Sequence, residues 1–376
     1  MNFLAYYFIA SAIYFAMVWW DNARLCFQAF PTADRKRKKW PLVSVCIPAR
    51  NEETRIGPCL DSFVKQDYPN YEVIILDDQS TDGTWKVLQR YAKKNKNFKL
   101  MKGQTMPSGW KGKSWACHQL SAKAKGAYLL FIDADTWLTH DAIKRTIQGA
   151  EEKGSDMVSG MTGQVAKTWM EYLIVPVMCY DLISFFPKRF VLMKRSPLSQ
   201  LVWANGQFIF FKRKTYDTIG GHAAVKDRID EDMTFGKIVV GRGYQLSLFN
   251  VSVISTCRMY TSAKDVWDGF SKIMFQSFNY SYIQAFIGYM AVLAVTVLPF
   301  VLPFFVPPDT LLFKASVLLS AVQVIIRLEQ ARRFNFPVFS SFLHPIANFI
   351  FILIGFNSMR WYFIGKSYWK GRTVEV

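Results

Sequence analysis

Two aspartates separated by one residue, Asp133 and Asp135, directly follow the apolar run 128–132 in this chain of 376 residues. Such a run is typical of a buried strand. Two carboxylates on the turn after it supply the hard oxygen ligands that Mg²⁺ or Mn²⁺ prefers. A cation there would neutralise the charge that accumulates on a departing diphosphate. The alternative is that Asp135 merely caps the next helix.

A basic turn and an acidic pair are the other residues whose types could do chemistry. Lys111 and Lys113 lie on a glycine-containing turn at the start of a predicted helix, where charge and backbone N–H groups could hold a phosphate. The spacing is not that of a Walker loop, and a solvated basic turn is the other interpretation. Glu231 and Asp232 open a later helical stretch. A carboxylate there could be the general base for an acceptor hydroxyl, or simply the negative charge that helix N-termini favour.

Alternating strands and helices must position these residues. The expected strands are 43–47, 71–76 and 128–132, and the expected helices are 52–66, 84–94 and 114–124. This order predicts a parallel sheet with helices on both faces, in which ligands bind beyond the carboxyl ends of the strands. Asp77 and Asp78 follow the second strand, so we expect them at the same edge as Asp133 and Asp135.

Composition and charge favour a membrane partner. The chain has 46 Lys and Arg residues against 28 Asp and Glu, a formal net charge of +18, and 51% hydrophobic residues. Disordered and collagen-like chains are excluded, because they lack this content of large apolar residues. The basic residues cluster beside uncharged apolar runs, where anionic lipid headgroups explain them, so no nucleic-acid partner is expected. Six cysteines without CxxC spacing indicate neither a zinc site nor a disulfide framework.

Four apolar runs are long enough to be membrane segments. Residues 1–20 carry no charge, and the basic start and small-residue cleavage site of a signal peptide are missing. The basic cluster 35–39 follows and places the next domain in the cytoplasm by the positive-inside rule. The other runs are 285–306, 311–326 and 338–359. Prolines interrupt 285–306, which predicts a kink or a re-entrant segment.

The topology of the C-terminal region stays open. Counting four crossings puts the tail outside, whereas its basic residues argue for the inside; these are Arg360, Lys366, Lys370 and Arg372. We expect three parts: a transmembrane helix with its basic juxtamembrane segment at 1–40, a cytoplasmic domain at 41–264, and an interfacial helix with a membrane region at 265–376. These segments predict a multi-pass protein of the cell membrane with its catalytic domain on the cytoplasmic face.

Five segments, in order, resemble glycosyltransferase family 2, the GT-A nucleotide-sugar enzymes. They are 43–53 (VSVCIPARNEE), 76–84 (LDDQSTDGT), 131–135 (FIDAD), Gly206 through Gly220-Gly221, and Glu231-Asp232. One N-terminal helix with several C-terminal ones resembles members that glycosylate lipids, including carotenoid- and hopanoid-associated branches. The resemblance implies an α/β GT-A domain, a mostly parallel central sheet flanked by helices, with N- and C-terminal transmembrane helices.

The resemblance also implies roles for individual residues. Ala49 and Glu52 match positions that hold the nucleotide, Asp78 one that contacts the uracil, and Lys113 one that reaches the diphosphate. Asp133 would support the nucleotide side of the metal, and Asp135 would ligate Mg²⁺ or Mn²⁺. Asp232 would be the base of an inverting transfer, with Glu231 beside it and Gly206 in an acceptor-side segment.

One departure from the family bears on the product. Processive members carry QxxRW near the membrane, and the segment 276–280 here has Asn279 and Tyr280 in place of the Arg and Trp. Without the guanidinium and the Trp platform, transfer of a single sugar is favoured over chain synthesis. Aromatic residues crowd this region and predict either an interfacial helix or a route for a lipid acceptor; they are Trp267, Phe270, Phe275, Phe278, Tyr280 and Tyr282.

The sequence therefore predicts a membrane-bound inverting glycosyltransferase that moves one sugar from a nucleotide-sugar, a UDP-sugar above all, to a lipid-soluble acceptor. A processive polysaccharide synthase is one alternative. A non-catalytic membrane scaffold that retains the fold is another.

Overall fold

Two compact units make up the chain in the computed structural model, which describes residues 2–26, 28–31, 39–365, 368–369 and 372–373. A sheet unit comprises Arg24–Gly163 and Lys188–Arg258. A helical unit comprises Met1–Ala23, Gln164–Pro187 and Met259–Val376. Residues 35–38 of the basic cluster, and Lys366 and Lys370 of the tail, lie outside the described residues, so the expectations based on them stay predictions.

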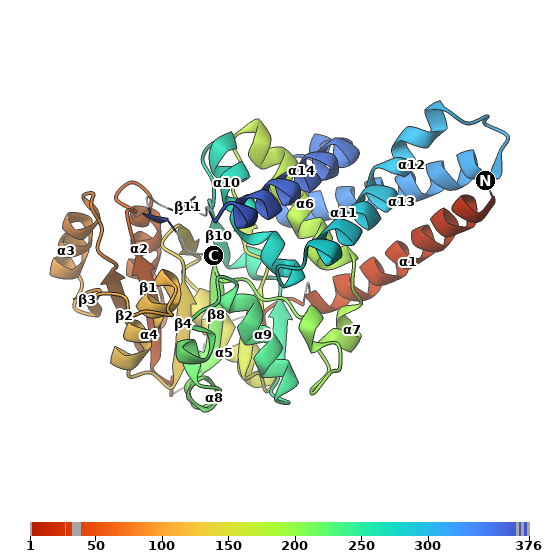
Figure 1. Ribbon diagram of the computed structural model, residues 1–376. Coiled ribbons are helices and arrows are strands. Elements are labelled where there is room, and N and C mark those ends of the chain that lie inside the picture. The colour runs from red at the N-terminus through yellow and green to blue at the C-terminus, as the bar shows by residue number, and fades with distance from the viewer. Residues whose placement is uncertain (1, 27, 32–38, 366–367, 370–371, 374–376) are drawn as a thin grey trace. The chain divides into compact units, whose positions relative to one another are not determined.

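A seven-stranded sheet forms the centre of the sheet unit, with the order β3-β2-β1-β4-β8-β6-β9 (Figure 1). Only β8 runs antiparallel to its neighbours β4 and β6; the other pairs are parallel. The predicted mostly parallel α/β sheet is thus confirmed. The strands are β1 (Val43–Ala49), β2 (Tyr71–Asp77), β3 (Phe98–Lys102), β4 (Tyr128–Ile132), β6 (Met157–Gly160), β8 (Phe208–Lys212) and β9 (Leu246–Phe249).

The pairing of the strands brings the expected site residues to one edge. Ala49 at the end of β1 pairs with Asp77 at the end of β2, and β4 runs parallel to β1. Because β8 is reversed, its first residue Phe208 pairs with Ile132, the last residue of β4. The segment before β8, which contains Gly206, therefore lies at the same edge as Asp133.

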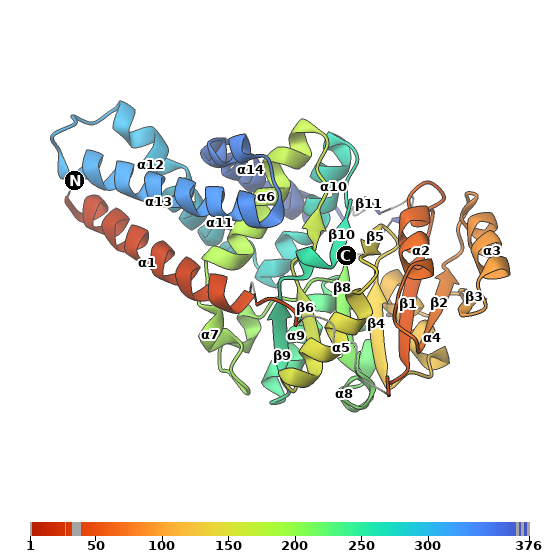
Figure 2. The same cartoon turned by 180° about the vertical axis from the view of Figure 1, so that it is seen from behind.

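Helices cover both faces of this sheet. Helices α4 (Gly112–Lys123) and α9 (Glu231–Gly241) lie on one face, and α2 (Ile56–Val64) and α5 (Ala142–Glu152) on the other (Figures 1 and 2). Helix α3 (Thr84–Lys94) has the predicted bounds. Helix α2 begins four residues later than expected, because the N–H groups of Arg55 and Ile56 both bond to Glu52 O in a turn.

The core between these layers is apolar. Val45, Ile47 and Ile75 are fully buried in it, and each such side chain contributes about 1.5–3 kcal/mol on burial. The remaining elements of the unit are short: α7 (Lys188–Val191), η1 (Ser199–Leu201), α8 (Arg213–Thr218), η2 (Gly221–Val225), η3 (Val251–Val253), and a small sheet of β5 (Thr136–Leu138), β10 (Ser255–Cys257) and β7 (Gly163–Gln164).

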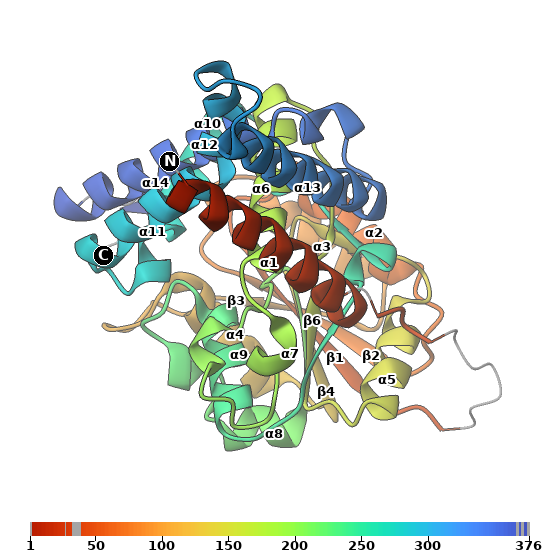
Figure 3. The same cartoon turned by 90° about the vertical axis from the view of Figure 1, so that its right-hand side faces the viewer.

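Within the residues that the structure describes, the helical unit holds four helices long and apolar enough to cross a membrane, judged by length and composition (Figure 3). These candidates are Asn2–Leu25, Tyr282–Phe304, Leu311–Phe334 and His344–Phe363. They correspond to α1 (Asn2–Cys26), α11 (Tyr282–Thr296) with α12 (Leu298–Val301) and η5 (Leu302–Phe304), α13 (Leu311–Phe334) and α14 (His344–Phe363). The break between α11 and α12 falls just before Pro299, as the prolines predict.

One segment departs from the expected domain division. Residues 164–187, placed by the sequence within 41–264, cluster with the apolar helices. They contain α6 (Trp169–Ser184), which packs against α14, α10 (Ala263–Ile273) and α13. At 16 residues, with Pro176 inside it, α6 is too short to be recognised as a membrane span. The amide of Asn22 on α1 also donates to Phe186 O at 2.7 Å.

Candidate active site

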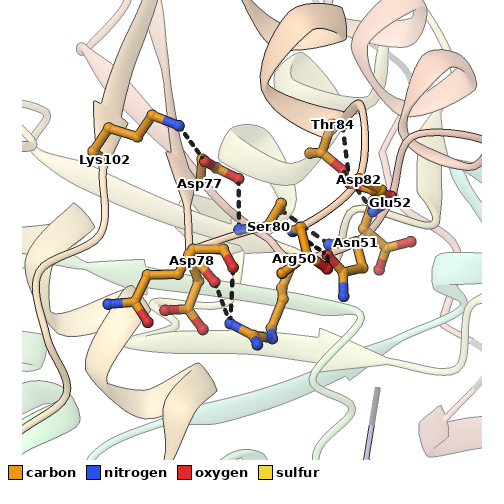
Figure 4. Close-up of polar contacts among 11 residues, drawn as sticks. Arg50, Asn51, Glu52, Asp77, Asp78, Ser80, Asp82, Thr84 and Lys102 are labelled. Carbon is orange, nitrogen blue, oxygen red and sulfur yellow. Dashed lines mark hydrogen bonds and ion pairs between the residues drawn. The ribbon is translucent and has the colours of Figure 1, made fainter. Parts of the chain in front are cut away.

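Two loops interlock where β1 and β2 end, and we call them the hydrogen-bonded edge (residues 50–53 and 78–84). The N–H of Glu52 donates to Thr84 Oγ1 at 2.8 Å, and the N–H of Thr81 donates to Asn51 Oδ1 at 2.9 Å (Figure 4). Asp78 N–H donates to Ala49 O at 2.8 Å. The structure therefore brings together Ala49, Glu52 and Asp78, the three residues expected at the nucleotide.

Asp77 is buried beneath the loops of this edge and stabilises them, so its carboxylate is not available to a ligand. Its carboxylate is 1% exposed, pairs with Lys102 of β3 at 2.7 Å and accepts from Ser80 N–H at 3.3 Å (Figure 4). Arg50 donates to Asp78 O at 2.6 Å. The sequence showed the Asp77-Asp78 pair but not this division of roles. Lys102 was missed because β3 was not among the expected strands.

A charged cluster lies beyond the last residue of β4 and the first residue of the reversed strand β8. Its members are Lys113, Asp133, Glu231 and Asp232. Lys113 Nζ is 2.8 Å from Asp133 Oδ1 and 3.1 Å from Glu231 Oε1. Three elements meet here, because Lys113 lies in the first turn of α4, Asp133 follows β4 and Glu231 begins α9. Burial lowers the pKa of Lys113, but the carboxylates of Asp133, Glu231 and Asp232 outweigh it and hold that pKa well above its ordinary value. Lys113 is therefore a cation throughout the physiological range.

Asp232 has the environment of a general base. Its Oδ2 accepts from Gly206 N–H at 2.7 Å and its Oδ1 from Met233 N–H at 2.8 Å. Burial and the neighbouring Glu231 charge raise the pKa of Asp232 to about 7, against the opposing effect of Lys113 and the two N–H groups. A carboxylate with a pKa near the working pH is well matched to taking a proton.

The close approach of this cluster favours glycine at position 206. A Cβ at that position would lie 2.9 Å from Lys113 Nζ and 3.1 Å from Asp232 Oδ2. Its neighbours fix the loop, since Asn205 N–H donates to Ser159 Oγ at 2.9 Å and Gln207 N–H donates to Asn205 Oδ1 at 3.1 Å. Asn205 belongs to the acceptor-side segment that the sequence indicated, whereas Ser159 was missed because no spacing marks it and only the tertiary fold brings it beside Asn205.

Asp135 points to a different neighbour from Asp133. Its Oδ1 lies 3.4 Å from both Thr136 Oγ1 and Cys257 Sγ. Burial and the Asp135 carboxylate raise the pKa of the Cys257 thiol well above its ordinary value, which keeps it a protonated donor. In the described part of the chain, no three His, Cys, Asp or Glu side chains gather as a metal site. Two carboxylates fit a hard cation whose remaining ligands are phosphate oxygens and water.

The fold agrees with that of a solved nucleotide-sugar enzyme. A mannosyltransferase from Pyrobaculum calidifontis, determined in complex with GDP-Man and Mn²⁺, aligns with a TM-score of 0.54 and 18% identity over 95% of this chain and 98% of that one. At this identity the likeness concerns the fold alone. The sheet unit thus has a GT-A-like α/β fold.

A family model matches a continuous stretch of the chain that covers most of the sheet unit. Residues 44–220 match the model of glycosyl transferase family 2, so this part of the chain is a family 2 glycosyltransferase domain. The predicted family and fold are confirmed.

Curated relatives share parts of the chain. A poly(ribitol-phosphate) beta-glucosyltransferase of Bacillus spizizenii is 38% identical over 31% of this chain and 18% of its own length. A beta-monoglucosyldiacylglycerol synthase of a Nostoc species is 29% identical over 52% of this chain and 41% of its own. A 4,4'-diaponeurosporenoate glycosyltransferase of Staphylococcus aureus is 26% identical over 61% of this chain and 60% of its own. The chain spans less than two thirds of the length of each.

Proposed function

We propose that this chain is a membrane-bound, inverting glycosyltransferase that moves a single sugar from a UDP-sugar to a lipid-soluble acceptor. The observation that carries the proposal is the charged cluster. A carboxylate with a raised pKa, Asp232, lies next to a fixed cation, Lys113, at the carboxyl edge of a family 2 domain. Cation and base are the two groups that transfer from a nucleotide diphosphate to a hydroxyl requires.

The donor would bind across the two loop regions of this edge. Ala49, Glu52 and Asp78 would hold the nucleotide, and Lys113 would neutralise the diphosphate. Asp133 and Asp135 would hold Mg²⁺ or Mn²⁺, which when bound neutralises negative charge on the leaving group. The Mn²⁺ in the Pyrobaculum calidifontis complex supports a divalent cation for this fold.

Asp232 would act on the acceptor. As the acceptor oxygen forms its bond to the anomeric carbon, the bond from that carbon to the diphosphate breaks and its electron pair leaves with the nucleotide. Asp232 takes the acceptor proton in the same step. A single displacement of this kind inverts the anomeric configuration. Glu231 stays paired with Lys113 and keeps the ammonium beside the leaving group.

The acceptor and the location follow from the apolar helices and the relatives. Four candidate spans support a multi-pass protein of the cell membrane. The basic cluster 35–39 favours the cytoplasmic face for the sheet unit. Two relatives act, by their names, on diacylglycerol and diaponeurosporenoate, which supports a lipid-soluble acceptor. The poly(ribitol-phosphate) relative makes a polymeric acceptor the second candidate, over a shorter match.

The test is transfer by the purified full-length chain. UDP-sugars and GDP-mannose are offered in turn with a lipid extract and with poly(ribitol phosphate), with Mn²⁺ and with a chelator. Mass spectrometry then identifies the product, and NMR gives its anomeric configuration. We expect a lipid carrying one sugar, inverted relative to the donor and formed only with the cation.

Asp232→Asn removes the base and is expected to lower the transfer rate by about 10²–10⁴-fold. Asp227→Asn, which changes an exposed acid close by in the sequence, is the matched control and should keep full activity. Full activity of Asp232→Asn would refute the assigned base. Chains of sugars would favour a processive synthase, and a purified protein inert towards every donor would favour a scaffold.

A further inference from the structure

A segment whose sequence is both apolar and basic begins within α7 of the sheet unit, and Figure 1 labels that helix. Between Asp181 and Asp217 the chain contains no acidic residue. Residues 189–198, with the sequence RFVLMKRSPL, lie in the middle of this stretch, and we call them the basic loop. They are not part of the site, of the sheet or of the candidate membrane spans.

Large apolar side chains of the basic loop are open to solvent. Phe190 is 54% exposed, Met193 57% and Leu198 40%. Lys194 and Arg195, which lie between them in the sequence, are exposed as well. Exposed apolar side chains gathered in one short segment mark an interaction surface more often than a bare solvent face.

Two cations of the loop, Lys194 and Arg195, have no acidic partner among the described residues. Two cations further along the same acid-free stretch form ion pairs. Lys212 Nζ lies 3.7 Å from Asp156 Oδ1, and Arg213 Nε lies 2.9 Å from Asp217 Oδ2. Lys194 and Arg195 differ, because no carboxylate of the described residues lies within ion-pair distance of either. A surface with this positive charge is complementary to an anionic partner. Apolar side chains interleaved with cations suit a bilayer, where the former enter the acyl boundary and the latter meet headgroups.

The loop is held in place by its buried residues. Val191 and Ser196 are 0% and 5% exposed, and Ser196 Oγ donates to Phe190 O at 2.7 Å. Arg195 N–H donates at 2.8 Å to Val240 O, near the end of α9. The helix that begins with Glu231 and Asp232 therefore ends against the basic loop. Exposure of Phe190 and Met193 is thus a property of a fixed backbone conformation.

We propose that the basic loop binds the surface of an anionic lipid bilayer, with Phe190, Met193 and Leu198 inserted and Lys194 and Arg195 at the headgroups. The chain continues from the loop through η1 to Gly206, so this contact would hold the acceptor side of the site at the surface in which a lipid-soluble acceptor is dissolved. That consequence rests on the proposed function, whereas the bilayer contact does not.

Hydrogen–deuterium exchange of the full-length chain in nanodiscs tests the contact without any transfer assay. One nanodisc contains phosphatidylcholine alone, and the other contains phosphatidylcholine mixed with the anionic phosphatidylglycerol. We expect backbone amides of 189–198 to exchange at least about tenfold more slowly in the anionic nanodisc, since each cation at such a surface adds about a fivefold factor. Residues 93–96, which are basic but lack large apolar side chains, should change little.

Variants separate charge from insertion. The double variant Lys194→Glu, Arg195→Glu should lose the preference for the anionic nanodisc, and Phe190→Ser, Met193→Ser should lose the slowing itself. Lys93→Glu and Val64→Ser are the matched controls for charge and exposed apolar area. Unchanged exchange of β1 and β4 shows that each variant has folded.

Slowing is measured against the same chain in detergent. Equal slowing in both nanodiscs would overturn recognition of anionic lipid. Slowing in neither would overturn the bilayer contact and leave a protein partner for the loop. Because exchange needs neither donor nor acceptor, failure of the proposed function would leave this result untouched.

Discussion

The two halves of the site edge are stabilised in different ways. The hydrogen-bonded edge is fixed by neutral N–H groups bonded to side-chain oxygens, as in Glu52 N–H to Thr84 Oγ1. The charged cluster is fixed by a single ammonium, Lys113, between Asp133 and Glu231. Bonds donated by neutral N–H groups hold a binding surface whose electrostatics change little when a ligand arrives. Opposed charges hold a centre whose balance shifts as soon as a diphosphate or a cation enters it.

The pKa values of two aspartates, one in each half, are shifted in opposite directions. Hydrogen bonds from Thr84 and from the N–H of Glu53 lower the pKa of Asp82 in the hydrogen-bonded edge, although burial alone would raise it. Burial and Glu231 raise the pKa of Asp232 in the charged cluster to about 7. The first carboxylate is stabilised as an anion, and the second is ready to accept a proton.

Among the changes that test this comparison, removal of the Lys113 ammonium should lower the transfer rate most. Lys113→Met leaves Asp133, Glu231 and Asp232 as uncompensated carboxylates and removes the diphosphate contact. We expect the transfer rate to fall by about 10²–10³-fold, comparable to the loss of one preorganised transition-state donor. Steady-state kinetics of sugar transfer measure this. Lys123→Met, an exposed lysine at the other end of α4, is the control, and an equal loss there would show that α4 rather than the charge is responsible.

Crowding the cluster should have the next largest effect. In Gly206→Ala the new Cβ would lie 3.1 Å from Asp232 Oδ2, so the carboxylate must shift. We expect a fall of about tenfold to a hundredfold in kcat with the donor KM nearly unchanged, because misplacement of a reacting group by a fraction of an ångström is costly. Gly57→Ala on α2, where nothing lies within 4 Å of the new Cβ, should behave as wild type. A raised KM with unchanged kcat would contradict the placement of Gly206 beside the base.

The pH dependence of transfer tests the raised pKa of Asp232. Only the carboxylate can take a proton, so kcat should fall about tenfold per pH unit below about 7. Lys113→Met should move this midpoint upward, because a cation that favours the carboxylate is lost. A rate independent of pH over roughly pH 5 to 8 would refute Asp232 as the titrating group.

Stability should depend on pH with opposite signs in the two halves. The pKa of Asp232 is higher folded than unfolded, so its contribution weakens as pH rises from the ordinary range of an aspartate through about 7. The pKa of Asp82 is lower when folded, so its contribution is present above that ordinary range and is lost as pH falls through the folded value. The free energy of unfolding of Asp232→Asn and of Asp82→Asn, each compared with wild type across pH, measures the two contributions. The same sign in both variants would contradict the comparison.

The smallest effect is expected in the hydrogen-bonded edge. Thr84→Val leaves Glu52 N–H without its acceptor and should lower the free energy of unfolding by about 1–3 kcal/mol. Donor KM should rise a few-fold while kcat stays close to wild type, because the loop shapes binding rather than the reaction. Thermal denaturation and donor titration measure the two. Thr218→Val, an exposed threonine of α8, is the control.

Much of this arrangement could be predicted from the sequence, and the limits have physical causes. The apolar runs followed by Asp77 and Asp133 predicted that these acidic residues lie at one edge of the sheet. Parallel strands share one direction, so their carboxyl ends meet at the same edge. The reversal of β8 could not be predicted, since strand direction depends on partners far along the chain. The Lys113 contacts with Asp133 and Glu231 were missed for the same reason. The position of α6 was missed because a helix whose side chains are mostly buried lacks the periodicity that marks an amphipathic one.

The reversed strand β8 also sets the order in which the molecule can be assembled. The strands β1 to β4 lie within residues 43–132, so they can pair early in synthesis. Until Phe208–Lys212 emerges and docks, β4 has an unprotected edge that can pair with another chain. Nascent chains that stall between these segments are therefore the ones most prone to aggregate, and no shortened chain ending before α9 contains the charged cluster.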